Sequence, residues 1–262
     1  MPLGFAAPLL ALVLAVVFLG GAVKGVVGFG YSVASTAVLA LFIEPTTAVV
    51  LMIVPMLVGN VSLVRELSRD GLVSCVDRFW PYVAAAVAGV VAGMLFLDRV
   101  PRAWLALALG VLVLGYVAAK QDAVALPVAL PAGCFTERPL VKVGMGLASG
   151  GIFGASNVGI QTVIYLDRLD LDRATFVGVL SMFLAVLSMV RVGMAMSLGL
   201  YDAGGGLLAL SLVAAVLGLA GVGVGRRSRH VLPDRLCEVG VLAIFLVVGL
   251  RLTYGGAIGV LG

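Results

Sequence analysis

Two basic residues lie inside long apolar stretches of this 262-residue sequence. Arg191 has no charged neighbour between Arg173 and Asp202, and Lys24 is the only charged residue before Glu44. A charge at the centre of a lipid bilayer costs at least about 2.5–3.5 kcal/mol, so such a residue usually faces a cavity or an opposite charge. No acidic residue lies close to either cation in the sequence. An anionic ligand is one candidate counter-ion, and snorkelling of the side chain to an interface is the alternative.

Polar residues accompany glycine clusters at two places, near position 30 and near position 155. A glycine-broken helix leaves free amides where the next helix begins, and such a helix start attracts anions. Glycines also serve simply to pack helices closely, which is the expected role of Gly21, Gly25, Gly146 and Gly150. Together with Gln161 and the two cations, these clusters give nine predicted substrate-binding residues: Lys24, Gly28, Gly30, Ser32, Gly154, Ser156, Asn157, Gln161 and Arg191.

Other kinds of chemistry find little support in the residues. The sequence has no G-x-S-x-G or HExxH motif and no paired carboxylates within an apolar stretch, so an enzyme is not expected. The single histidine, His230, lies in a basic segment, and the cysteines are far apart, so we expect no metal, cofactor or disulfide. Three further polar residues are expected to bridge helices rather than bind a ligand: Asn60, Ser62 and Ser188.

The composition indicates which elements must position the cations. Apolar residues make up 62% of the chain and charged residues 11%, with a mean hydropathy of +1.22, which is far outside the range of soluble domains. The positive net charge is not gathered on a soluble face, so a nucleic-acid partner is not expected. The composition therefore predicts an all-α membrane protein. Full-length spans are predicted at 46–64, 79–97, 103–119, 174–197, 204–225 and 236–254.

The sequence also repeats itself. Ser62-Leu63-Val64-Arg65 is matched by Ser188-Met189-Val190-Arg191, and the glycine clusters recur in the same order at almost the same offset. The repeats are about 1–125 and 126–262, and they are expected to form one integrated transmembrane domain. Each repeat begins with a glycine-broken apolar stretch, 8–43 or 140–166, followed by three of the predicted spans.

Loop charges decide how the broken stretches are arranged. If each stretch is a single kinked span, Lys and Arg divide almost evenly between the two sides of the membrane. If each is a hairpin of two short helices, twelve basic residues fall on one side and three on the other, as the positive-inside rule requires. The second arms, about 31–43 and 156–166, cover about 20 Å or less of a core about 30 Å thick. We therefore predict ten segments in two inverted repeats, each a short broken-helix hairpin plus three transmembrane helices, with both termini outside the inner membrane.

The pattern resembles the sulfite exporter TauE/SafE family of membrane permeases along nearly the whole chain. The resemblance lies in the glycine-rich segments that begin at Gly21 and Gly146, in Glu44-Pro45-Thr46-Thr47, and in the Gly-aliphatic steps at Gly71 and Gly199. It implies transport of small sulfur-containing anions such as sulfite, thiosulfate or organosulfonates.

The predicted function is therefore a secondary transporter that works by alternating access, with a small anion and the lipid bilayer as its partners. An anion channel and a membrane-embedded sensor or binding subunit of the same architecture remain alternatives. Whether the chain forms a homodimer is left open.

Overall fold

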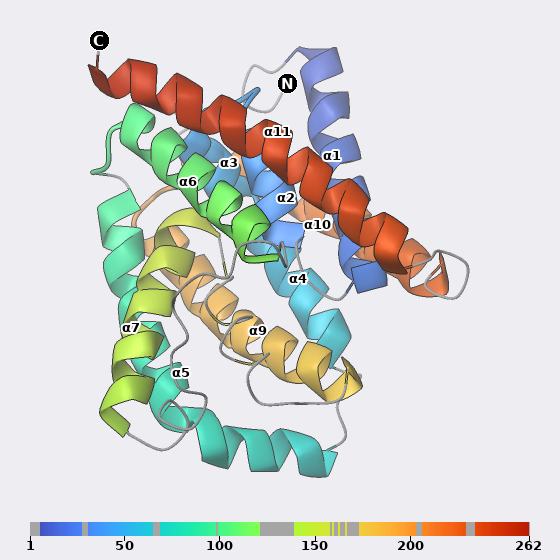
Figure 1. Cartoon of the computed structure of the whole chain (residues 1–262), viewed down its shortest axis with the longest axis vertical. Helices are drawn as coiled ribbons and strands as arrows, with labels where there is room; N and C mark the ends of the chain where they lie inside the picture. Colours follow the sequence, from blue (N-terminus) through green and yellow to red (C-terminus); the bar gives the residue numbers. More distant parts are fainter. Residues whose placement is uncertain are drawn as a thin grey trace.

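The structure is a computed structural model, and it describes residues 6–27, 31–64, 69–97, 99–120, 139–157, 159, 162, 166, 173–202, 206–228 and 234–261. Every secondary-structure element in this part of the chain is a helix (Figure 1). In chain order they are α1 (Ala7–Val27), α2 (Tyr31–Leu39), α3 (Pro45–Leu51), α4 (Ile53–Val64), α5 (Arg69–Leu97), α6 (Arg102–Lys120), α7 (Pro139–Ser156), α9 (Arg173–Ser197), α10 (Leu207–Ser228) and α11 (Asp234–Leu261).

Six helical stretches of the described chain are long and apolar enough to cross a membrane. They are Ala7–Val26, Pro45–Val64, Trp80–Leu97, Thr175–Ser197, Leu207–Ser228 and Leu242–Leu261. Five of them coincide with predicted spans. The sixth prediction, 103–119, falls on α6, whose apolar part Arg102–Gly115 is shorter. Helix α1 was predicted only as one arm of a hairpin, yet it is itself long enough to cross.

The first predicted break falls where α1 ends. Helix α1 stops at Val27 and α2 begins at Tyr31, with residues 28–30 outside the described part. Helix α2 has nine residues and is about 14 Å long, so it cannot cross a hydrocarbon core. It ends at Leu39, before the predicted position 43. A short arm next to the first glycine cluster is therefore present.

The second predicted break falls at the end of α7. We expected it around Gly150, Gly151 and Gly154, with a new helix from about 156; α7 runs through these glycines and ends at Ser156. The predicted second arm, 156–166, lies largely outside the described residues. The glycines do not interrupt α7 because α5 packs directly against them. A methyl group at Gly150 would overlap the backbone of Ala86, and one at Gly154 would lie 2.7 Å from the carbonyl oxygen of Val90. Beyond Asn157 the structure describes only Gly159, Thr162 and Leu166 before α9 begins.

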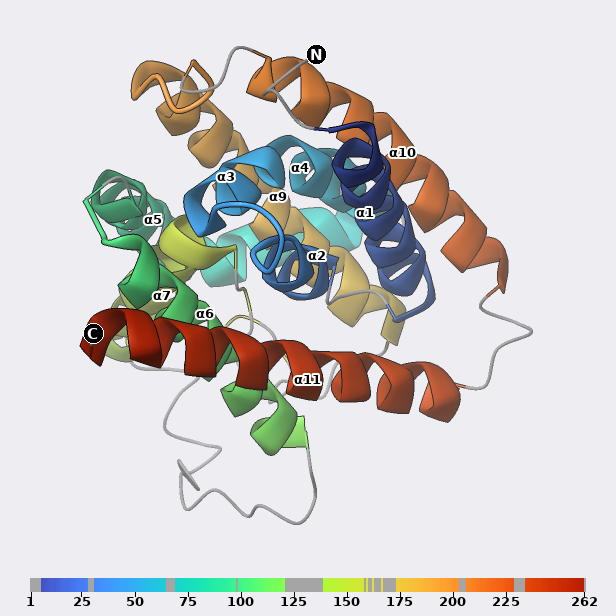
Figure 2. The same cartoon turned by 90° about the horizontal axis from the view of Figure 1, so that it is seen from above.

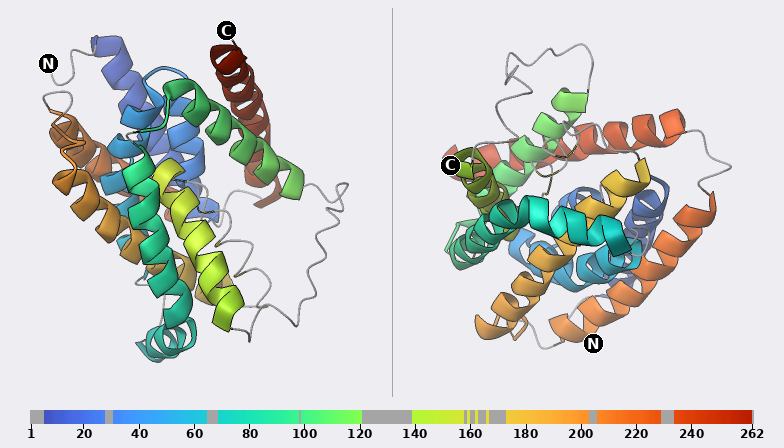
Figure 3. Two further views of the ribbon diagram at one scale, coloured as in Figure 1. Left: turned by 90° about the vertical axis from the view of Figure 1, so that its left-hand side faces the viewer. Right: turned by 90° about the horizontal axis from the view of Figure 1, so that it is seen from below.

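The main helix pairs each join a helix from residues 1–125 to one from 126–262. Helix α1 packs on α10, α5 on α7, α4 on α9 and α6 on α11, and Figures 1, 2 and 3 show the pairs α6–α11, α1–α10 and α5–α7 side by side. Small residues form the α1–α10 contact: a methyl group at Gly21 would meet the backbone of Gly218, and one at Gly25 that of Val222. The packing role predicted for these glycines is confirmed.

Helix α2 lies in the middle of this arrangement, enclosed by the longer helices (Figure 2). It contacts α1, α3, α6 and α11, and its residues Ser35 and Thr36 are buried. Polar side chains at this position are shielded from solvent. The short arm therefore brings hydrogen-bonding groups of the first half to the centre of the molecule.

Candidate functional site

Arg191, near the C-terminal end of α9, is completely buried, with 0% of its surface exposed. Its guanidinium carbon lies over the ring of Phe153 from α7, 5.1 Å from the ring centroid. No carboxylate approaches it in the described chain, where the one ion pair joins the largely exposed Arg102 to Glu44. A buried charge without an opposite charge is strongly unfavourable. The cation predicted from the sequence therefore lies in the protein's interior, and no carboxylate of the described residues compensates its charge.

Asn157 holds one end of the Arg191 guanidinium. It directly follows α7 and has a φ of 63°, in the left-handed region that asparagine tolerates better than most residues. Its Oδ1 accepts a hydrogen bond from Nη1 of Arg191. Its Nδ2 donates to the hydroxyl of Thr36 on α2 at 3.0 Å and to the carbonyl of Val49 on α3 at 2.9 Å. One side chain thus connects four helices from both halves of the chain.

The carbonyls at the end of α3 are bound in the same way. Helix α3 stops at Leu51 and α4 begins at Ile53; Pro55 in α4 has no N–H to donate to the Leu51 carbonyl. Side chains of the second half supply donors here. The Ser211 hydroxyl donates to the Leu51 carbonyl at 2.7 Å, and the Tyr201 hydroxyl donates to the Val50 carbonyl at 3.3 Å. With the bond to Val49, three successive carbonyls of the first half accept hydrogen bonds from the second.

Several donors beside these bonds have no partner. In the described part of the chain, Nε and Nη2 of Arg191 and the hydroxyls of Ser181 and Ser188 are buried and unpaired. Positions 181 and 188 lie on one face of α9, and 191 is close to that face, along about 15 Å of helix. Buried polar groups without partners are rare in native proteins and often mark a ligand or an ordered water. The interior face of α9 thus carries several polar groups that no described side chain pairs, and those of Arg191 can only donate.

Lys24 forms a second buried cation, with 4% of its surface exposed. Its ammonium group donates to Oδ1 of Asn60 on α4, and Nδ2 of that amide has no partner in the described residues. The ring of Tyr31 and the stem of Lys24 both lie close to Gly59. Snorkelling does not describe this lysine, because its charged end is directed to a buried amide.

A third polar cluster joins α5 of the first half to residues of the second half. The hydroxyls of Tyr82 on α5, Ser149 on α7 and Thr162 lie 2.8–3.0 Å from one another in a triangle. All three residues are buried, and each hydroxyl has a neutral partner. We interpret this cluster as an internal anchor.

The remaining predicted site residues are placed as follows. Three of them lie outside the described residues: Gly28, Gly30 and Gln161. Ser32 lies in α2, but its side chain is not among the described ones. Gly154 packs against α5, and the Ser156 hydroxyl donates to the Ile152 carbonyl of its own helix at 2.6 Å. Neither forms the helix start that we expected. The structure brings together Asn157 and Arg191 and buries Lys24 elsewhere; substrate binding by any of the nine residues stays a prediction.

The polar residues expected to bridge helices show three outcomes. Asn60 does bridge, to Lys24. Ser62 instead donates to the Gly59 carbonyl of its own helix at 2.8 Å, and Ser188 has no partner among the described residues.

Sequence reasoning missed Thr36, Phe153, Tyr201 and Ser211. One signal was available, because Pro55 inside an apolar helix implies a carbonyl at Leu51 that needs a donor from elsewhere. The phenyl ring beneath Arg191 left no comparable signal.

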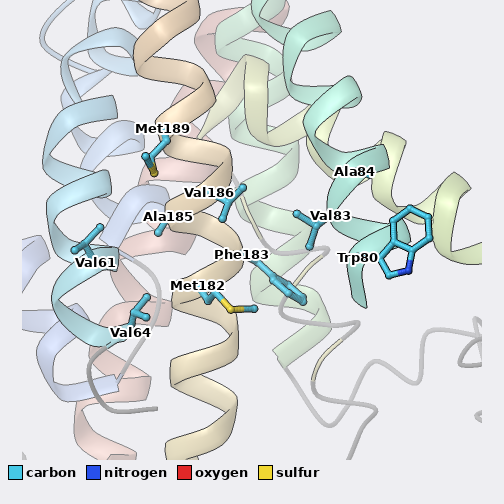
Figure 4. A pocket seen from close by; sticks show the side chains of 10 residues that line it. All are labelled: Val61, Val64, Trp80, Val83, Ala84, Met182, Phe183, Ala185, Val186 and Met189. Carbon is cyan, nitrogen blue, oxygen red and sulfur yellow. The ribbon is translucent and has the colours of Figure 1, made fainter. Parts of the chain in front are cut away.

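A large apolar groove lies on another face of α9 (Figure 4). Helices α4, α5 and α9 enclose about 740 Å³, lined by Val61, Val64, Trp80, Val83, Ala84, Met182, Phe183, Ala185, Val186 and Met189. Among the described residues no charged side chain lines it, and Trp80 and Met189 are largely exposed. It therefore suits hydrocarbon rather than an anion, and it is not the candidate site.

Comparison with known proteins gives one match. A family model described as "Sulfite exporter TauE/SafE" matches residues 13–252. No curated protein and no solved structure matches the chain.

Proposed function

This chain belongs to the sulfite exporter TauE/SafE family and is a multi-pass membrane protein, and on that premise we propose that it is a secondary transporter of small sulfur-containing anions such as sulfite, thiosulfate or organosulfonates. The proposal goes beyond family membership in three respects: transport by alternating access, a site centred on Arg191, and two inverted repeats.

The single observation that carries the proposal is the uncompensated charge of Arg191. The guanidinium is fully buried, and in the described chain it has an amide oxygen and an aromatic face as neighbours but no carboxylate. A buried cation without a partner is strongly destabilising, and an anion that completes the pair offsets much of that cost. A transported anion supplies that charge when it binds and takes it away when it leaves.

The helix pairs support the inverted-repeat part of the proposal. Helix α4 pairs with its counterpart α9, and α6 with its counterpart α11. The other two pairs are counterparts of each other, because α1 packs on α10 and the corresponding helix α7 packs on α5. The short α2 enters the centre from the first half. Helix α1 begins and α11 ends at the same end of the molecule (Figures 1 and 3), as expected if both termini lie outside.

Flux into proteoliposomes tests the proposal. The purified protein should take up radiolabelled sulfite or thiosulfate with saturation, and internal unlabelled anion should accelerate uptake by counterflow. Arg191→Ala should abolish uptake, whereas Arg251→Ala, which removes an exposed arginine from α11, should leave it unchanged.

The other outcomes identify the alternatives. Flux without saturation or counterflow would indicate a channel, and binding without flux would indicate a sensor. Full transport by Arg191→Ala would show that the site is elsewhere.

A further inference from the structure

The unpaired atoms of Arg191 are the two that lie along one edge of its guanidinium. Nη1 donates to Asn157, while Nε and Nη2 have no partner in the described chain although both are buried. In a planar guanidinium, the N–H of Nε and the nearer N–H of Nη2 point in the same direction. They form the fork that binds two oxygen atoms of one anion.

We propose that the transported anion is an oxoanion that places two oxygen atoms of one central atom against the Nε–Nη2 edge of Arg191. This inference rests on the proposed transport function and narrows it to a class defined by shape. Sulfite, sulfonates and thiosulfate meet the requirement. Chloride and thiocyanate do not, because a single acceptor atom shared by two parallel donors forms two bent, longer hydrogen bonds in place of two straight ones.

Asn157 is the positioning residue that keeps this edge free. Its amide is held by Thr36 at 3.0 Å and by the Val49 carbonyl at 2.9 Å, so its oxygen is fixed where it engages Nη1. Phe153 covers one face of the guanidinium. One end and one face are therefore occupied by neutral groups, and the edge with two donors is oriented before any ligand arrives, which lowers the entropy cost of binding.

The burial of the edge makes the discrimination large. An oxoanion gives each donor its own oxygen and a straight bond, whereas a halide or thiocyanate leaves the two buried donors sharing one acceptor at unfavourable angles. The loss of about one hydrogen bond to a charged group corresponds to roughly tenfold or more in affinity. Net charge alone would give no such preference, since all these anions are attracted by the cation.

Equilibrium binding to the purified full-length protein tests the inference. Sulfite and methanesulfonate should bind at least about tenfold more tightly than chloride or thiocyanate at equal ionic strength. Arg191→Lys keeps the charge but has no planar fork, so it should weaken oxoanion binding about tenfold or more and leave thiocyanate binding within about twofold. Arg251→Lys is the matched control and should change neither. Asn157→Gly should reduce the ratio of oxoanion to thiocyanate affinity, a readout that a merely structural role would not change.

The outcomes separate this inference from the proposed function. Equal binding of oxoanions and thiocyanate to the wild-type protein, or undiminished selectivity in Arg191→Lys, would overturn the edge assignment while transport stands. Selective binding without flux would overturn transport while the edge assignment stands. No binding of any of the four anions would overturn both. The wild-type selectivity decides the inference even where a variant does not fold.

Discussion

Replacing Asn157 by glycine and, separately, by alanine measures what its side chain and its backbone each contribute. Both changes remove the bonds to Arg191, Thr36 and Val49. Both replacements must adopt the left-handed conformation, with a φ of 63°. Only alanine has a Cβ that clashes with the backbone in this conformation. We therefore expect alanine to be the more harmful replacement. This order is the reverse of that in an ordinary helix, where glycine is worse by about 0.5–1 kcal/mol.

The structure sets the approximate magnitudes. Two of the lost bonds join neutral groups and are worth about 0.5–1.5 kcal/mol each, and the bond from the guanidinium is worth about 1.5–3 kcal/mol. Asn157→Gly should therefore destabilise the protein by roughly 2.5–6 kcal/mol. Asn157→Ala should cost a further 1–2 kcal/mol or so from the strained backbone. With a Tm change of about 2–4 °C per kcal/mol, the alanine variant should unfold roughly 2–8 °C below the glycine variant.

Heating the detergent-solubilised protein and measuring the monodisperse fraction that remains gives the two Tm values. Gly144→Ala provides the control on α7, because a methyl group there meets nothing within 4 Å and should not lower Tm. An alanine variant as stable as the glycine variant would refute the left-handed conformation. Two variants with wild-type Tm would refute the hydrogen bonds as well.

Three further predictions concern the packing of α1 on α10, the break between α3 and α4, and the membrane topology. Gly225→Leu should disrupt the α1–α10 contact and leave little folded protein, because its Cβ would overlap the backbone of α1. Gly223→Leu on the same helix meets open space and should be tolerated. The yield of monodisperse protein measures both effects. Ser211→Ala should cost about 1–3 kcal/mol in the wild-type protein, but less in Pro55→Ala, where a restored N–H can reach the Leu51 carbonyl; equal Tm losses in a double-mutant cycle would contradict this explanation. The three cysteines should all resist an impermeant thiol reagent applied from outside, and reaction of any one would refute the ten-segment arrangement.

The helices were predictable because the constraint on them is simple. A membrane span must satisfy its backbone internally and present about 20 apolar residues, so hydropathy alone locates it. The spans at 174–197 and 204–225 accordingly differ from α9 and α10 by no more than three residues at either end. Gly150 and Gly154 do not interrupt α7, which ends only at Ser156, because glycine has two uses that a sequence does not distinguish. In α7 the missing Cβ admits the backbone of α5, and the helix continues.

The site was half predictable for a related reason. The cost of a buried charge makes Arg191 conspicuous in a sequence, since a cation among so many apolar residues must either bind a partner or reach an interface. The groups that orient it leave no such trace. Phe153 is one apolar residue among many, and Thr36 comes from a helix more than a hundred positions away, so only the assembled fold shows that they meet near Asn157.

If Arg191 binds the anion as proposed, Asn157 makes that binding depend on the relative position of the two halves. Its amide group is fixed by Thr36 and Val49 of the first half, while its oxygen holds Arg191 of the second. If the halves rock against one another, as alternating access requires, these bonds lengthen together and the guanidinium loses its fixed edge. The arginine would then bind an anion tightly only in the closed arrangement and weakly in the open one. Such a difference in affinity is what a bound ligand needs in order to shift the equilibrium between the two states, because a ligand with equal affinity for both would shift nothing.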